Sequence, residues 1–334
     1  MSDGGEGEES GYFASILLYG GIGFFALYFI RKFIKGAQFS ERVSAKDLNV
    51  VVTGANCGIG FETAKELNLK KANVFMVCRS EEKANAAKRQ MVRMGCDATR
   101  LHFIECDLTS FESVRKAAKE LLESTDRIDI LINNAGIMFQ SKHEATKDGH
   151  ERTWQSNHLG PFLLTELLLP TIEKSSYARI INVSSKLHLE STKINLATID
   201  EKKGYGMMKA YNNSKLANVM YARWLAIRMK RNGVEHVTVN SLHPGVVDTE
   251  LTRSTPLYWP VIKQITAPFR WYFLRTARDG AQTSLHVALS KKLGGVSGKY
   301  FSDCKIVAEN PLALDDNACE DLYNYSLEQT GLAK

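Results

Sequence analysis

The segment VVTGANCGIG, residues 51–60, constrains the fold of this chain more than any other. An apolar run at residues 48–52 leads through Gly54, Gly58 and Gly60 into an amphipathic pattern near Phe61, which predicts a buried parallel strand, a tight turn and a helix. Such a turn directs backbone N–H groups and the positive end of the helix dipole toward one point, where a pyrophosphate can bind. The spacing is GxxxGxG and not the general GxGxxG fingerprint, so on this segment alone a nucleotide site and a simple turn remain equal alternatives.

Five further apolar runs alternate with helical patterns along the chain, at residues 74–78, 101–106, 128–132, 180–183 and 237–242. This alternation predicts an α/β fold with one doubly wound, Rossmann-type parallel sheet that carries helices on both faces. Thr109 and Glu112 predict a capping box on the helix after the third strand. Ligands of such sheets bind beyond the carboxyl ends of the strands. The residues at those ends are Gly54–Gly60, Arg79, Asp107, Asn133–Gly136, Ser184–Ser185 and Pro244–Gly245.

The composition excludes several classes of protein. A chain of 334 residues with 44% apolar and 24% charged residues can bury one large core or two modest ones. The net charge of +6 comes without a basic stripe interleaved with aromatics, so nucleic acid is not an expected partner. The six cysteines contain no CxxC pair and the eight histidines no HExxH, which predicts free thiols in a reducing compartment and no metal site.

The N-terminus contains a candidate membrane anchor. Twenty residues between Gly11 and Ile30 carry no charge, and as a helix they would span roughly 30 Å, the hydrocarbon thickness of a bilayer. Acidic residues precede this run, and Arg31, Lys32 and Lys35 follow it, which favours an uncleaved single-pass anchor with the rest of the chain in the cytosol. The endoplasmic reticulum is the default membrane for such an anchor. The alternative to an anchor is that this apolar run forms a buried core helix.

The domain boundaries follow from these patterns. We expect an acidic tail at residues 1–10, the transmembrane anchor and its basic flank at 11–34, a linker at 35–46, and one catalytic domain at 47–334. A substrate lid is expected at about residues 250–276, because aromatic and basic side chains alternate there without clear periodicity. The plainer interpretation of this segment is a helix packed on the core.

Tyr211 and Lys215 are four residues apart in a helical pattern and share one helix face. A phenol has a reference pKa near 10, and a neighbouring ammonium favours the phenolate, which suits an acid or base near neutral pH. Such a pair is common by chance, so its meaning depends on the other motifs.

Together, the motifs at Thr53–Gly60, Asn133–Gly136, Ser184–Ser185, Tyr211-x-x-x-Lys215 and Pro244–Thr249 resemble the short-chain dehydrogenase/reductase family, over about residues 46–330. TARDGAQTSLHVAL at residues 276–289 and GKYFSDC at 298–304 resemble its membrane-anchored retinol dehydrogenase branch.

The resemblance implies a role for each motif. Tyr211 would be the general acid/base, Ser185 would hydrogen-bond the substrate oxygen, and Lys215 would bind the nicotinamide ribose and lower the pKa of Tyr211. Asn157 matches the family's fourth catalytic position, which supports the lysine and a proton-relay water. The implied cofactor contacts are Thr53, Gly54, Asn56, Cys57, Gly58, Ile59 and Gly60 around the diphosphate, Asp107 at the adenine, Asn134, Ala135 and Gly136 along the cofactor floor, and Pro244, Gly245 and Thr249 near the nicotinamide.

Arg79 and Ser80 bear on the choice of cofactor. NAD enzymes usually place a carboxylate at the end of the second strand, whereas this chain has Cys78, Arg79 and Ser80 there. The guanidinium could clamp a 2′-phosphate bidentately, so NADP(H) is favoured over NAD(H). The alternative is a solvated arginine, and Cys57 takes a place where many NADP-preferring relatives carry a basic residue.

The expected substrate is a small lipophilic alcohol or carbonyl compound, with retinol and retinal as the leading pair. The alternatives are a steroid or other lipid-carbonyl reductase and a non-catalytic nucleotide-binding membrane scaffold. A homodimer is compatible with the sequence.

Overall fold

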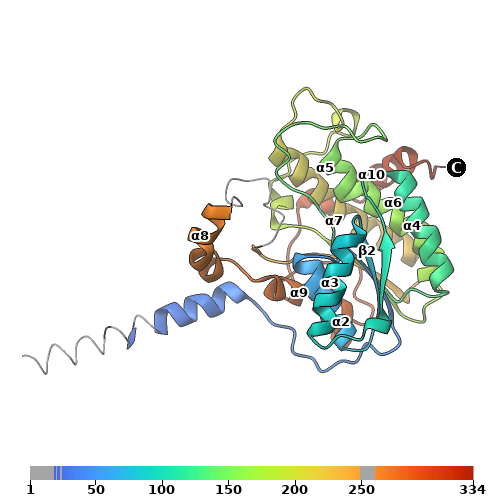
Figure 1. The fold of residues 1–334 in the computed structure, drawn as a ribbon. Coiled ribbons are helices and arrows are strands. Elements are labelled where there is room, and N and C mark those ends of the chain that lie inside the picture. Colours follow the sequence, from blue (N-terminus) through green and yellow to red (C-terminus); the bar gives the residue numbers. More distant parts are fainter. Residues whose placement is uncertain (1–18, 20, 23–24, 249–259, 334) are drawn as a thin grey trace, which may run out of the picture.

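The computed structural model describes residues 19, 21–22, 25–248 and 260–333 (Figure 1). Thr249, the first part of the predicted lid and most of the predicted transmembrane span therefore lie outside the described residues.

In the described part of the chain, eight strands form one sheet in the order β3-β2-β1-β4-β5-β6-β7-β8. All neighbouring strands are parallel except β7 and β8. The chain order reverses between β1 and β4, which is the switch point of a doubly wound sheet. The strands are β1 Asn49–Thr53, β2 Asn73–Cys78, β3 Leu101–Glu105, β4 Ile130–Asn133, β5 Ala178–Val183, β6 Val237–His243, β7 Tyr300–Ser302 and β8 Lys305–Ile306.

Helices cover both faces of this sheet, as predicted (Figure 1). Val50 and Val52 of β1 belong to one buried cluster and Val51 to the other, because successive side chains of a strand point to opposite faces. One face carries α2 Gly58–Leu69, α3 Glu81–Arg93 and α9 Ala277–Leu289, and the other α4 Phe111–Ser124, α6 Gly160–Ile172, α7 Met207–Arg231 and α10 Asp316–Gln329.

The described chain contains further helices and turns. They are α5 Arg152–Trp154, a π-helical turn at Gln155–Leu159, α8 Pro260–Phe273 and 3₁₀ turns at Ala98–Arg100, Lys186–Glu190, Leu196–Thr198, Lys291–Leu293 and Pro311–Leu314. All six cysteines are free, and Cys57 and Cys304 are partly exposed while the other four are buried.

Two local predictions were wrong. Helix α2 begins at Gly58, not near Phe61. The predicted capping box at Thr109 does not form, because Ser110 is the N-cap of α4 and its Oγ accepts from the N–H of Ser113. Thr109 instead donates its hydroxyl to Asp107 Oδ1 at 2.7 Å. The local hydrogen bond to Asp107 competes with the helix for the threonine side chain.

The N-terminal helix covers residues 25–35 and lies on the same side of the molecule as α8 (Figure 1). Among the residues that the structure describes, no helix is both long and apolar enough to cross a bilayer. Because the predicted span, residues 11–30, falls largely outside those residues, it stays a prediction.

Candidate active site

The glycine-rich turn joins β1 to α2 and requires its glycines. Gly54 and Gly58 have φ angles of +68° and +57°, in the left-handed region that glycine adopts without strain. A Cβ atom on Gly60 would lie 2.3 Å from the carbonyl oxygen of Gly54, a contact that no side chain tolerates. The N-cap residue Cys57 contributes no side-chain cap to α2, so the first N–H groups of the helix remain available to an anion. This turn therefore fits a dinucleotide diphosphate.

The NNAG segment is bonded directly to this turn. Thr53 Oγ1 accepts from the backbone N–H groups of Asn134 and Ala135, each at 2.9 Å. In return, Asn134 Nδ2 donates to the carbonyl of Thr53 at 2.8 Å. The two predicted cofactor segments thus lie side by side at the switch point of the sheet, between β1 and β4.

Helix α7 carries Tyr211 and Lys215, both buried. Lys215 Nζ lies 5.6 Å from the centre of the Tyr211 ring and donates to the carbonyl of Val183 at 3.0 Å. The Ser185 side chain lies close enough to the Tyr211 hydroxyl to lower the pKa of Tyr211. Ser184, its neighbour, instead donates to the carbonyl of Lys215 at 2.7 Å. The structure thus distinguishes the two serines and brings Ser185, Tyr211 and Lys215 together.

Asn157 lies in the π-helical turn and is fully buried. Its Oδ1 accepts from the N–H of Ile137 at 2.8 Å, and its Nδ2 donates to Ile137 O and to Ser214 Oγ at 2.9 and 3.0 Å. A Cβ on Gly136 would lie 3.3 Å from both Asn157 Oδ1 and Lys215 Nζ. The amide therefore holds the end of the NNAG segment close to the lysine. Neither the π turn nor the role of Ser214 was anticipated from the sequence.

Burial dominates the electrostatics of the pair. It raises the pKa of Tyr211 to about 12, and the nearby Ser185 side chain only partly opposes this. It lowers the pKa of Lys215 to about 8. The sequence-based expectation of a tyrosine pKa lowered by the ammonium was therefore wrong for this arrangement, because burial removes the phenolate from water and so disfavours it.

Arg79, Ser80 and Asp107 lie at the carboxyl ends of β2 and β3. Arg79 is exposed, and its Nη1 lies 3.9 Å from Asp107 Oδ2. Ser80 is the N-cap of α3 and accepts from the N–H of Lys83 at 3.3 Å. Asp107 also accepts from Thr109. The guanidinium is thus a cation at the edge of the predicted adenine site, where the acidic residue typical of NAD enzymes is replaced.

Pro244 and Gly245 follow β6, and Gly245 has a φ angle of +93°. The carbonyl of Pro244 accepts from Arg275 Nη1 at 3.4 Å. Sequence reasoning missed Arg275, because no motif links it to a loop 31 residues earlier.

Comparisons with known proteins agree with this geometry. The profile of the family described as short chain dehydrogenase matches residues 48–257. Human retinol dehydrogenase 12 is 41% identical over 91% of this chain and 92% of its own length. The crystal structure of an uncharacterized protein from Mycobacterium paratuberculosis is 29% identical, covers 89% of this chain and 98% of its own, and superposes with a TM-score of 0.70. The NADP active-site complex of Pseudomonas aeruginosa RhlG is 25% identical over 77% of this chain and 95% of its own, with a TM-score of 0.59.

Proposed function

The chain belongs to the short-chain dehydrogenase/reductase family, and we propose that it is a membrane-anchored enzyme that transfers a hydride between NADP(H) and a lipophilic alcohol or carbonyl compound of the retinol/retinal type. The observation that carries this proposal is the convergence of Ser185, Tyr211 and Lys215 at the end of β5. A scaffold protein has no need for a buried tyrosine hydroxyl beside a buried ammonium.

The residues of the site divide the work in a simple way. When bound, the nicotinamide cofactor supplies or accepts the hydride. Because burial raises the pKa of Tyr211 to about 12, its hydroxyl stays protonated at neutral pH and can donate its proton to the substrate oxygen during carbonyl reduction. Ser185 orients the same oxygen through its hydroxyl. Lys215 would hold the cofactor ribose, since its ammonium lies 5.6 Å from the centre of the Tyr211 ring and next to Gly136.

Tyr211→Phe tests the proton donor. We expect turnover to fall by about 10²–10⁴-fold, the usual contribution of a positioned acid, while NADPH binding changes little. Tyr221→Phe removes a hydroxyl from the same helix that donates to Glu166 instead, and should keep turnover. Activity in Tyr211→Phe equal to that of Tyr221→Phe would exclude this role for Tyr211. An inactive wild type that still binds NADPH would favour the scaffold alternative.

Our preference for NADP(H) rests on Arg79. An exposed guanidinium at the carboxyl end of β2 suits the bidentate recognition of a 2′-phosphate, and the RhlG complex contains NADP. Arg79→Glu should weaken NADPH binding by tenfold or more and leave NADH binding nearly unchanged. Arg89→Glu makes the same charge change on the exposed face of α3 and serves as the control. Equal losses for both cofactors would contradict this assignment.

The substrate class and the membrane attachment are inferred from the exposed apolar side chains of α8 and from the N-terminal helix beside it. Helix α8 exposes Ile265, Phe269, Trp271 and Phe273. It lies near the N-terminal helix, whose second half carries the basic residues Arg31, Lys32 and Lys35. Large exposed apolar side chains of this kind suit a bilayer interface. With the human relative named a retinol dehydrogenase, we propose a single-pass anchor in the endoplasmic reticulum, a cytosolic domain and a retinoid substrate.

A panel of retinal, steroid ketones and fatty aldehydes, each with NADPH and with NADH, tests this assignment on the detergent-solubilised protein. We expect the highest kcat/KM for retinal. A preference for steroid ketones would support the alternative of a steroid reductase, and glycosylation of an engineered acceptor site after residue 46 would contradict the cytosolic orientation.

A further inference from the structure

The end of the N-terminal helix and the segment that follows it pack along α9, and we call residues 31–41 the strap. Arg31 Nη2 lies 3.9 Å from Asp279 Oδ2 in the first turn of α9. Further along, the N–H of Phe39 donates to Gln282 Oε1 at 3.1 Å. At the other end of α9, Ser290 donates to a carboxylate oxygen of Glu41 at 2.5 Å. The strap therefore follows α9 over its whole length instead of leaving its surface. The predicted domain boundary at residue 46 stays a prediction, but part of the predicted linker makes these contacts.

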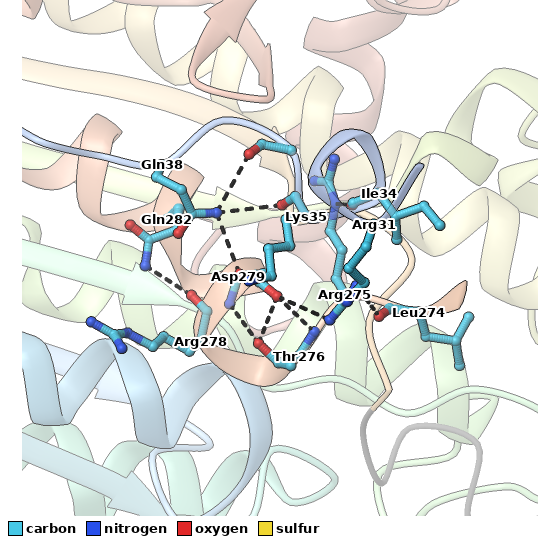
Figure 2. Close-up of polar contacts among 11 residues, drawn as sticks. Arg31, Ile34, Lys35, Gln38, Leu274, Arg275, Thr276, Arg278, Asp279 and Gln282 are labelled. Carbon is cyan, nitrogen blue, oxygen red and sulfur yellow. Dashed lines mark hydrogen bonds and ion pairs between the residues drawn. The ribbon is translucent and has the colours of Figure 1, made fainter. Parts of the chain in front are cut away.

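Arg31 is the first fixed point of the strap. The residue is only 8% exposed, and its Nη1 donates to the carbonyl of Leu274 at 3.1 Å, as Figure 2 shows. Its guanidinium also lies 5.2 Å from the centre of the Trp271 ring of α8. A charged group is rarely buried to this degree without partners, so these contacts indicate a specific interaction between the strap and the end of α8.

Arg275 is the second fixed point and the more connected one. Its Nε donates to the carbonyl of Ile34 at 2.9 Å, and its Nη2 pairs with Asp303 Oδ1 at 2.6 Å, in the turn between β7 and β8. Its Nη1 donates to Pro244 O at 3.4 Å. One guanidinium thus joins the strap, the sheet edge and the loop after β6.

Two glycines make room for this side chain. A Cβ on Gly36 of the strap would lie 2.2 Å from Arg275 Nη2, and a Cβ on Gly245 would lie 2.3 Å from Arg275 Nη1. Both glycines have positive φ angles, +71° and +93°. The backbone of Arg275 also bonds the same loop, since its N–H donates to Val246 O and its carbonyl accepts from the N–H of Asp248, each at 2.9 Å.

Helix α9 extends these contacts to the glycine-rich turn. A Cβ on Gly280 would lie 2.7 Å from Val247 Cγ2 and 3.1 Å from Ile59 Cγ1. The first turn of α9 thus touches both the loop after β6 and the start of α2. The strap therefore contacts α9, and α9 in turn contacts two predicted cofactor segments.

We propose that Arg275 is a positioning residue that ties the strap to the loop at residues 244–248, so that the membrane-proximal strap is a working part of the cofactor site. This proposal rests on the proposed NADP(H)-dependent function, because that loop is expected to contact the nicotinamide. Its physical basis is the fork of the guanidinium, which binds three separate backbone or carboxylate oxygens at once. A lysine ammonium is a compact point charge and cannot reproduce that geometry.

The first test uses Gly36→Ala in the full-length, detergent-solubilised protein. The added methyl group must displace the Arg275 guanidinium without touching any predicted cofactor contact. We expect NADPH to bind at least threefold more weakly and the amides of residues 244–248 to exchange hydrogen faster. Gly233→Ala is the matched control, because Gly233 has a φ of +74° and no heavy atom within 4 Å of the added Cβ.

The second test uses Arg275→Met and Arg275→Lys. Both substitutions should raise the KM for NADPH by about tenfold or more, with a smaller change in kcat. The KM of Arg275→Lys should be no closer to the wild-type value than that of Arg275→Met. Wild-type NADPH affinity in Arg275→Met, or equal behaviour of Gly36→Ala and Gly233→Ala, would overturn the proposal. If the wild type bound no NADPH, the proposed function would fail, and the hydrogen exchange of residues 244–248 would still test the coupling between strap and loop.

Discussion

Gly60→Ala is the substitution whose consequence follows most directly from the geometry of the glycine-rich turn. The new Cβ would lie 2.3 Å from Gly54 O and 2.4 Å from Asn134 Nδ2. Both of these atoms are held in place. The N–H of Gly54 donates to Val77 O at 2.8 Å, and Asn134 Nδ2 donates to Thr53 O at 2.8 Å. The methyl group therefore cannot be accommodated by the rotation of a flexible side chain.

The size of the effect can be worked out from these distances. Ordinary contact begins at 3.4 Å, so the Gly54 carbonyl would have to move by about 1 Å. Overpacking of this kind costs about 1–3 kcal/mol, while replacing a helical glycine by alanine returns roughly 0.5–1 kcal/mol. The net loss is on the order of 1 kcal/mol, and at most about 2.5 kcal/mol. For a domain of this size it corresponds to a Tm lower by about 2 °C, and by about 4 °C at the upper end. Displacing the turn by the same distance should weaken NADPH binding by about tenfold or more.

Thermal unfolding and NADPH fluorescence titration measure both quantities on one preparation. Gly294→Ala is the control, since its added Cβ would lie 3.7 Å from the nearest heavy atom, Lys291 O. We expect that variant to stay within about 0.5 kcal/mol of the wild type. If Gly60→Ala unfolded at the same temperature as Gly294→Ala and bound NADPH normally, the close approach of α2 to the turn would be refuted.

Two further predictions concern buried groups. Burial lowers the pKa of both His158 and His243 to about 4 from an ordinary 6.5, so the unfolded chain binds more protons between those values. The free energy of unfolding should therefore be highest above pH 6.5 and fall as the pH drops toward 4, by on the order of 2 kcal/mol per histidine at pH 5. A Tm that does not change between pH 5 and pH 7.5 would contradict this prediction. Ser184→Ala should lower Tm with little change in kcat, because its hydroxyl binds the Lys215 carbonyl, whereas Ser185→Ala should lower kcat with little change in Tm. Kinetics and thermal unfolding of the two variants check this, and a reversed pattern would refute the assignment.

The first six strands were predictable from the sequence because each is a local apolar run long enough to recognise. Strands β7 and β8 were not, since they contain three and two residues and exist through pairing, as when Tyr300 aligns with Ser241 of β6. A segment of that length carries no period of its own. The wrong capping box at Thr109 has a related cause, because the competing acceptor, Asp107, is identified only once the turn is formed.

The residues of the candidate site were predictable where the side chains that lie together belong to one sequence motif. Tyr211 and Lys215 are one helical turn apart, and the sequence places both on one face. The pKa of Tyr211 was not predictable, because its direction depends on burial by distant segments. The contacts of Arg275 were equally inaccessible, since Ile34 lies 241 residues away in the chain. Long-range packing therefore determines both the pKa of Tyr211 and the contacts of Arg275.

The strand order explains why separate motifs form one site. Strands β1, β4, β5 and β6 are neighbours in that order, so the glycine turn, the NNAG segment, Ser185 and Pro244 follow one another along a single edge of the sheet. Lys215 lies at the middle of this edge, where its Nζ donates to Val183 at the end of β5 and would touch a Cβ on Gly136. A larger side chain at residue 136 would therefore press on the ammonium that lies beside the Tyr211 ring. A glycine at this position leaves room for the Lys215 ammonium and for the Asn157 amide.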